Sequence, residues 1–326
     1  MFTPAQLGLD DPARYVEAEE RFSRTASECA ASANVAGEGR ALLNTAWAVE
    51  KQGRGAEAIK LAETARHLLR DSEALSALAE CCHSIGVWRF HHFDDDPPVN
   101  DFREAIQVRL GTGDLMAAAQ SWHNMGYVQL ASGDVAGAWS SYEHATDLLR
   151  QVRDGGDTEL ASKAFRQFGF ILSHQAFAAA RHDSARAALQ ATGRYFDHVR
   201  LTGAHREPVY AYLAPGIALA ASREVPEDEA NALEALVGIA PDPESWLLAA
   251  VRQATDAMTS PVDTGTGRHA YLGARILALA ELARWHHMAG RGREADGLVD
   301  LAVNLSRARG WHGEAVRAAR VSEGSS

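Results

Sequence analysis

The stretch WHNMGYVQLASGDVAGAWSSYEHA, residues 122 to 145, decides the fold of this chain. Small residues at Gly126, Ala138 and Ala145 stand where two helices have to approach each other closely, and large side chains between them can fill the remaining space. The pair Gly133-Asp134 separates the two halves, where glycine ends one helix and aspartate caps the next. The stretch therefore predicts an antiparallel helical hairpin.

Together with Trp122, Met125 and Tyr142, these small residues have a spacing that resembles the tetratricopeptide repeat, a helix-turn-helix unit of about 34 residues. The resemblance implies an all-α fold, an α-solenoid of antiparallel helical pairs wound as a TPR-like right-handed superhelix. Roughly seven such pairs would account for the chain. A scaffold of this kind does not by itself name a function.

Other parts of the chain repeat the same register. Gly53, Ala58 and Ala65 match Gly133, Ala138 and Ala145, and a late unit matches them again with Gly290, Ala295 and Ala302. Prolines interrupt the pattern between these regions. The predicted organisation is a helical cap at 1–38, TPR-like repeats at 39–203 with an inserted His/Asp segment at 88–101, degenerate helical pairs at 204–268, a C-terminal TPR-like repeat at 269–320 and a tail at 321–326.

Composition limits the classes of partner. A net charge of -11 argues against nucleic acid, because non-specific affinity for phosphates comes largely from lysine and arginine. The chain has no run of about 18 apolar residues, and its first residues lack the charged and apolar regions of a signal peptide. We therefore expect a cytoplasmic protein that binds neither nucleic acid nor a membrane. Three cysteines are too few for a disulfide framework.

The concave face of the predicted solenoid is rich in aromatic and histidine side chains. In the tetratricopeptide family this face binds ligands, so the resemblance implies a peptide, protein or small-molecule ligand in the groove. Any one of these aromatic residues could instead pack between neighbouring repeats. The register and helical spacing place these candidate ligand-binding residues there: Trp47, His83, Phe90, His123, Tyr127, Arg166, Phe170 and Arg284.

The inserted segment brings imidazole and carboxylate groups together. His91, His92, Asp94 and Asp96 include the donor types found in iron, manganese and zinc sites. The candidate metal ligands are His92, Asp94 and Asp96, and the candidate catalytic residues are His91, His92 and Asp94. A solvated acidic loop after a helix C-terminus, where cationic side chains are favoured, is the alternative explanation.

Two functions follow from these features. The first is a binding module that holds its ligand in the aromatic groove. The second is an enzyme or accessory protein of specialised metabolism, in which the His/Asp segment supplies acid-base or metal chemistry and a divalent metal would be the cofactor. The position of His91 and His92 relative to Tyr127 and Phe170 distinguishes the two, because an enzyme would need them to share one enclosed pocket.

Overall fold

The computed structural model describes residues 12–93, 96–182, 184–202, 209–222, 226–259 and 268–322, so Asp94 lies outside the described residues. Within these ranges every regular element is an α-helix. In chain order they are α1 (Pro12–Ala31), α2 (Val35–Lys51), α3 (Gly55–Arg70), α4 (Leu75–His92), α5 (Val99–Gly111), α6 (Leu115–Ala131), α7 (Val135–Asp154), α8 (Thr158–His182), α9 (Ala185–Thr202), α10 (Val209–Ala221), α11 (Glu227–Val237), α12 (Pro243–Thr259), α13 (Arg268–Met288), α14 (Gly292–Arg309) and α15 (His312–Ser322).

The hairpin of α6 and α7 forms as the sequence predicts. Tyr142 is fully buried against Gly126, where a Cβ atom would lie 2.7 Å from the tyrosine ring. Gly133 has a φ of +86°, a conformation that favours glycine, and the side chain of Asp134 accepts a hydrogen bond from the amide of Gly137 at the start of α7. The pairs α2–α3, α4–α5, α8–α9 and α13–α14 also pack against each other as neighbours along the chain. The fold is a TPR-like α-solenoid.

The segment expected as an insertion is part of an ordinary hairpin. Its first residues form the last turn of α4, and α5 begins at Val99 after Pro98. Asp101 lies inside the first turn of α5, where it accepts hydrogen bonds from Arg66 and Arg89 and caps no helix. At the N-terminal side, α2 begins at Val35, before the boundary expected after residue 38.

The proline-interrupted region is helical, with α10 at its centre. This helix is buried over nearly its whole length and packs against α8, α9, α12 and α13. Pro215 lies inside α10, while Pro226 precedes α11 and Pro243 is the first residue of α12, a position where proline is well tolerated. The described residues of this region therefore form helices in spite of their prolines.

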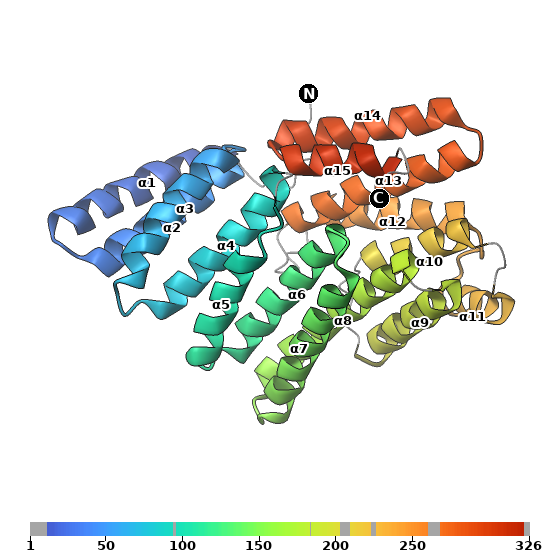
Figure 1. The fold of residues 1–326 in the computed structure, drawn as a ribbon, viewed down its shortest axis with the longest axis horizontal. Coiled ribbons are helices and arrows are strands. Elements are labelled where there is room, and N and C mark those ends of the chain that lie inside the picture. Colours follow the sequence, from blue (N-terminus) through green and yellow to red (C-terminus); the bar gives the residue numbers. More distant parts are fainter. Residues whose placement is uncertain are drawn as a thin grey trace.

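The solenoid closes on itself. Each of the inner helices α4, α6, α8, α10, α13 and α15 contacts the next, and α15 returns to contact α4. Figure 1 shows the C-terminal helices, in orange and red, lying alongside the end of α4. We call these six helices the inner ring. No helix among the described residues combines the length and apolar character needed to cross a membrane.

Candidate ligand-binding site

The ring is closed by a contact that we call the clasp, formed by Glu50, His91 and His92 on one side and Arg309, Gly310 and Glu314 on the other. Arg309 and Glu50 are both buried, and the guanidinium donates hydrogen bonds to the Glu50 carboxylate at 2.9 Å and to its backbone carbonyl at 2.8 Å. The Nδ1 atom of His92 lies 2.7 Å from the carbonyl oxygen of Gly310. Because a carbonyl only accepts hydrogen bonds, this nitrogen carries the proton.

The second half of the clasp involves α15. The ring of His91 stacks on Trp311 with centroids 4.3 Å apart, and its Nδ1 lies 2.8 Å from the carboxylate of Glu314. Burial opposes the charge of Glu314, but the guanidinium of Arg317 and the hydrogen bond from His91 hold its pKa below the usual range. Backbones approach closely here, since a Cβ atom on Gly313 would overlap the carbonyl oxygen of Phe93.

The clasp gives the candidate catalytic histidines a structural role, because both are engaged by the C-terminal helices. Among the described residues, no group of three or more His, Cys, Asp or Glu side chains is arranged to hold a metal ion. Asp94 lies outside the described residues, and Asp96 is exposed at the rim of the pocket described next. The catalytic and metal assignments of His91, His92, Asp94 and Asp96 therefore stay predictions.

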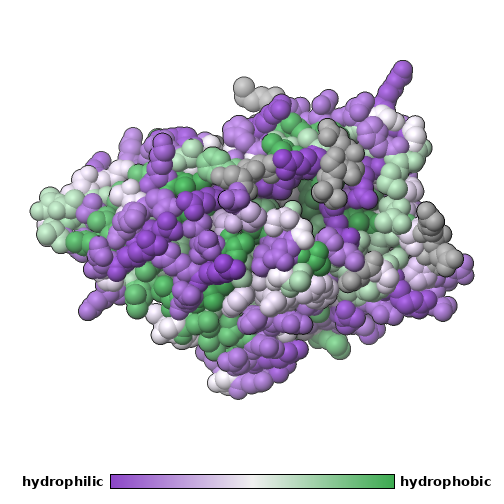
Figure 2. Space-filling model, viewed as in Figure 1, coloured by the Kyte–Doolittle hydropathy of each residue, from purple (hydrophilic) through white to green (hydrophobic). Residues whose placement is uncertain are grey.

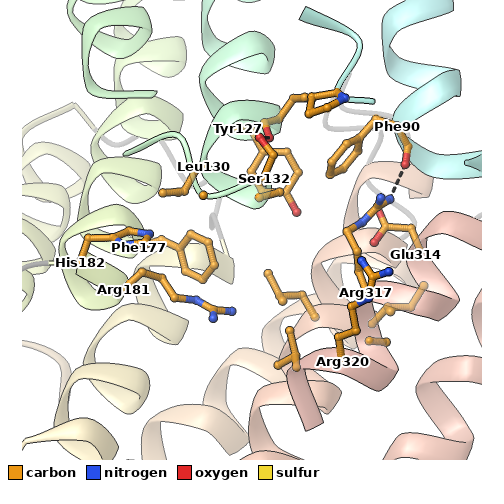
Figure 3. Close-up of a pocket in the computed structure, with 18 of the residues that line it drawn as sticks. Phe90, Tyr127, Leu130, Ser132, Phe177, Arg181, His182, Glu314, Arg317 and Arg320 are labelled. Carbon is orange, nitrogen blue, oxygen red and sulfur yellow. Dashed lines mark hydrogen bonds and ion pairs between the residues drawn. The ribbon is translucent and has the colours of Figure 1, made fainter. Parts of the chain in front are cut away.

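A pocket of about 870 Å³ lies inside the ring, and every inner helix contributes to its wall. We call it the central pocket (Figure 3). The inner helices supply Arg89 and Phe90; Tyr127, Val128, Leu130 and Ala131; Phe177, Ala180, Arg181 and His182; Ile217 and Ala221; Ile276, Leu277 and Arg284; and Glu314, Arg317, Ala318, Arg320 and Val321. The loops after α4 and α6 add Phe93, Asp96, Pro97 and Pro98, and Ser132 and Gly133.

Two arginines of the wall lie over aromatic rings. The guanidinium of Arg317 is 4.0 Å from the centroid of Phe90, and that of Arg181 is 5.4 Å from the centroid of Phe177. Such contacts are attractive and restrict the orientation of the cation. Tyr127 continues the aromatic surface, with its ring centroid 5.4 Å from that of Phe90.

Acidic side chains form ion pairs with arginines of the pocket wall. Glu281 is 3% exposed and contacts both Arg181 and Arg284, so one carboxylate serves two guanidinium groups. On α15, Glu314 lies 3.5 Å from Arg317. Arg89 is paired with Glu63 and Asp101. Four arginines of the wall therefore have carboxylate partners.

A layer of buried polar residues supports the wall behind Tyr127. The hydroxyl groups of Tyr127 and Tyr210 are hydrogen-bonded, the ring of His174 lies 4.0 Å from that of Tyr210, and His174 Nδ1 is 3.1 Å from His123 Nε2. Burial lowers the pKa of His174 to about 4 and, with the neighbouring His174, that of His123 well below its usual value. Burial also raises the pKa of Tyr127 to about 12. All these groups are neutral near pH 7.

His83 extends this polar layer towards α5. Its Nδ1 lies 2.9 Å from the hydroxyl of Ser121, which also accepts a hydrogen bond from buried Arg109. Burial lowers the pKa of His83 to about 3, with a smaller effect from the charge of Arg109. Arg109 in turn pairs with Glu80 at 2.9 Å. The network has the character of a polar core, in which each buried group needs a partner.

The structure brings only part of the predicted groove together. Phe90, Tyr127 and Arg284 line the central pocket, whereas His83 and His123 are buried in the polar layer. Three candidates lie elsewhere: Trp47 packs against Trp88 and under Lys51, Arg166 lies in a smaller depression with Lys163, and Phe170 lies near His123 with its carbonyl bound to His174.

Sequence reasoning missed Phe177, Arg181, Arg317 and Arg320 in the wall of the pocket. Arg181 lies in the last turn of the extended helix α8, and Arg317 and Arg320 are three residues apart in α15. For α15, the sequence offers one sign of a functional face, which is the helical spacing of two basic residues on the same side. The small residues of the repeat signature offer no such sign, because the last of them, Ala302, precedes this helix.

No protein-family model matches the sequence, and no curated protein matches it. Among solved structures, BtubC (BKLC) from P. vanneervenii is similar with a TM-score of 0.44 and 12% identity, over 90% of this chain and 91% of that one. A putative kinesin light chain from Podosopora anserina with TPR-like repeats has a TM-score of 0.32 and 13% identity, over 82% and 93%. A circular tandem repeat protein has a TM-score of 0.26 and 13% identity, over 94% and 88%. The TPR-like fold of this chain is established by its own hairpins.

Proposed function

We propose that this chain is a binding module that encloses a small ligand in the central pocket. The observation that carries the proposal is the closed inner ring, because α13 and α15 complete a wall where an open solenoid would offer a groove. The volume of about 870 Å³ lies within the range of roughly 300–1,000 Å³ that is typical of pockets for drug-sized molecules.

The outer surface of the molecule also favours a small ligand over a protein partner. Large exposed hydrophobic residues are scattered over many helices, for example Val16, Leu75, Leu201 and Met288. Figure 2 shows a face covered largely by hydrophilic residues, with hydrophobic residues in patches between them. Protein-binding surfaces more often present a contiguous apolar patch. Peptide and protein partners stay predictions.

The pocket is also held in shape before any ligand arrives. The polar layer supports Tyr127 from behind, Tyr127 and Arg317 contact Phe90, and the clasp holds α15 through His91 and Glu314. A site that needs little rearrangement loses less conformational entropy on binding, which favours affinity for a small molecule.

A neutral aromatic probe tests this proposal. N-phenyl-1-naphthylamine fluoresces in apolar surroundings, and we expect it to bind at one site per chain. Ala131 is exposed and lines the pocket, so Ala131→Trp should fill the space and abolish the saturable signal. Ala240→Trp, at an exposed position that is not part of the pocket wall, is the matched control and should leave binding unchanged.

Two results would overturn the proposal. One is the absence of saturable probe binding to the folded wild-type chain. The other is binding that survives Ala131→Trp undiminished while circular dichroism and thermal unfolding show an intact fold. In either case, a protein or peptide partner on the outer surface becomes the better hypothesis.

A further inference from the structure

We infer that the ligand of the central pocket is an uncharged, flat aromatic molecule with a carbonyl or similar acceptor atom, which accepts a hydrogen bond from the hydroxyl of Tyr127. This inference rests on the proposed function, because it needs the enclosed pocket. It adds the chemical class of the ligand and the residue that recognises its polar atom.

The ring of Tyr127 is held in one orientation in the aromatic part of the wall. Phe90 from α4 and Tyr210 from α10 meet it edge-on, with centroids 5.4 and 5.5 Å away, and His174 from α8 does so at 5.3 Å. In Figure 3 the ring lies between Phe90 and Phe177, with its hydroxyl directed into the open space. The hydroxyl is therefore presented to a ligand with little further loss of conformational entropy.

The hydrogen bond with Tyr210 leaves the proton of Tyr127 directed to the pocket. Tyr210 is not part of the pocket wall, and no other described residue accepts a hydrogen bond from its hydroxyl. If Tyr127 donated to Tyr210, the proton of Tyr210 would have no acceptor among these residues. Tyr210 therefore donates and Tyr127 accepts. Because a tyrosine hydroxyl has one proton, that of Tyr127 is left for an acceptor in the pocket.

The pKa values of the two tyrosines agree with this direction. Burial raises the pKa of both hydroxyl groups, and the hydrogen bond between them raises that of Tyr210 further but opposes the rise at Tyr127. Opposite effects of this kind are expected for a donor and its acceptor. The pKa of Tyr127 is still raised to about 12, so its hydroxyl keeps its proton at neutral pH.

The surroundings of this hydroxyl favour a neutral group over an ion of either sign. Burial is the main cause of the raised pKa of Tyr127, and of the nearby charges Glu314 raises this pKa whereas Arg317 and Arg181 lower it. Charges of both signs therefore act on the same point. Glu314 is paired with Arg317, and Arg181 with Glu281. A charged ligand would lose its hydration and compete with these pairs, whereas a neutral acceptor loses less.

The rest of the wall calls for an apolar body on the ligand. Phe90 and Phe177 flank Tyr127, and Leu130 and Ile217 add aliphatic surface. A small polar molecule would leave this surface in contact with water. A fused-ring skeleton would cover it and could pack against the aromatic rings edge-on or offset, while a carbonyl on that skeleton would reach Tyr127.

Two neutral probes with the same ring system isolate the hydrogen bond. 6-Propionyl-2-dimethylaminonaphthalene has a ketone oxygen on the chain next to its rings, and 6-propyl-2-dimethylaminonaphthalene has a methylene group in that place. We expect both probes to bind at one site per chain. Fluorescence titration gives the dissociation constant of each probe for the wild type and for every variant.

Tyr127→Phe removes the hydroxyl and keeps the ring. It should weaken binding of the ketone probe by about three- to tenfold, the range for a neutral hydrogen bond, and should not weaken binding of the propyl probe. The ketone probe emits at longer wavelength when its carbonyl accepts a hydrogen bond, so its emission should shift to shorter wavelength in this variant. Tyr271→Phe makes the same chemical change in α13, outside the pocket wall, and should alter neither quantity.

Two charged versions of the ketone probe test the preference for a neutral ligand. One has a sulfonate and the other a trimethylammonium group in place of the dimethylamino group. Both should displace the neutral ketone probe only at several-fold higher concentration than the neutral probe itself requires.

The outcomes distinguish this inference from the proposed function. An unchanged affinity for the ketone probe in Tyr127→Phe, an equal loss for both neutral probes, or tighter binding of either charged version would overturn the assigned ligand class and leave the enclosed pocket standing. Failure of both neutral probes to bind the folded chain would overturn the enclosed pocket itself. A loss confined to the ketone probe, with an emission shift that Tyr271→Phe does not show, would support the inference.

Discussion

The clasp and the central pocket are built from the same side-chain types but differ in how closely these pack. In the clasp, Arg309 meets the carboxylate of Glu50, His91 meets that of Glu314, and the backbones at Gly310 and Gly313 leave no space. In the pocket, charged and aromatic side chains surround an open volume of about 870 Å³. The difference indicates that the clasp holds the ring closed by direct contacts, whereas the pocket leaves room for a ligand.

Helix α15 belongs to both regions, since Glu314 contacts the clasp and Arg317, one turn later, lines the pocket. A ligand that binds Arg317 would therefore also favour the closed ring, because any molecule that binds one state preferentially stabilises that state. The experiments below test the two regions separately, beginning with the clasp.

Arg309→Met should give the largest effect. It removes the guanidinium that binds the buried Glu50 carboxylate. Breaking a buried ion pair costs up to about 3–5 kcal/mol, and Lys51, 3.3 Å from the same carboxylate, offsets part of that loss. Urea denaturation of the variant measures the loss in free energy of unfolding. Arg307→Met, two residues away on an exposed position, is the control and should change stability little. Equal small losses in both variants would show that the clasp does not hold the ring.

Gly313→Ala should destabilise the chain by about 1–3 kcal/mol, because the new Cβ atom would overlap the carbonyl oxygen of Phe93 and force the two segments apart. Gly297→Ala should have the opposite effect on stability. Its Cβ atom meets nothing within 4 Å, so better helix propensity should stabilise α14 by about 0.5–1 kcal/mol. Thermal unfolding of both variants checks the contrast, and a gain in both would mean that α15 does not approach Phe93 closely.

As the pH is lowered, the polar layer behind the pocket should lose stability at a higher pH than the clasp does. The pKa values of His83 and His174 are about 3 and 4, and that of His123 is also lowered, while unfolded histidine titrates near 6.5. As the pH falls below about 6.5, the unfolded state binds protons that the folded state excludes. Stability should fall by up to about 1.4 kcal/mol per pH unit for each histidine.

The clasp responds at lower pH. The pKa of Glu314 is lowered, so its contribution to stability is present above the usual glutamate value of 4.5 and is lost as the pH falls through the folded pKa.

His174→Gln tests the contribution of the polar layer. It should reduce the slope of stability against pH between 6.5 and 4.5, measured by urea denaturation at several pH values. His144→Gln, at an exposed position, is the control. An unchanged slope in His174→Gln would show that the pKa of His174 is the same in the folded and unfolded states.

Arg320→Gln should have the smallest effect on stability, below about 0.5 kcal/mol, because its side chain is exposed and surface substitutions usually fall in this range. It therefore contrasts with Arg309→Met, a similar loss of charge at the clasp. Thermal unfolding in the absence of any ligand makes the comparison. A loss as large as that of Arg309→Met would place Arg320 in the clasp and remove the distinction between the two regions.

The hairpins could be predicted from sequence because their contacts are local. Gly126, Ala138 and Tyr142 lie within one repeat, and their spacing alone requires two close helices. Ring closure could not be predicted in this way. His91 and Glu314 are 223 residues apart, and Glu50 and Arg309 are 259 residues apart, so no periodic pattern connects them.

Separation along the chain also decides which residues of the candidate site could be predicted. The sequence predicts His91 and His92 as catalytic residues, and His92 as a metal ligand, because Asp94 and Asp96 follow them in the chain. In the structure both rings face the C-terminal helices. Phe90 and Tyr127 could be placed in the groove by helical spacing. Arg181, Arg317 and Arg320 could not, because only the closed ring brings α8 and α15 to the same pocket.

A double-mutant cycle across the clasp tests ring closure most directly. The free energy of unfolding would be measured for the wild type, Glu50→Gln, Arg309→Met and the double variant. If the ring is closed by this pair, the two substitutions should show a coupling of about 2–3 kcal/mol, as expected for buried groups in direct contact. Coupling within about 0.3–0.5 kcal/mol of zero, the range for independent sites, would contradict a closed ring and the pocket that depends on it.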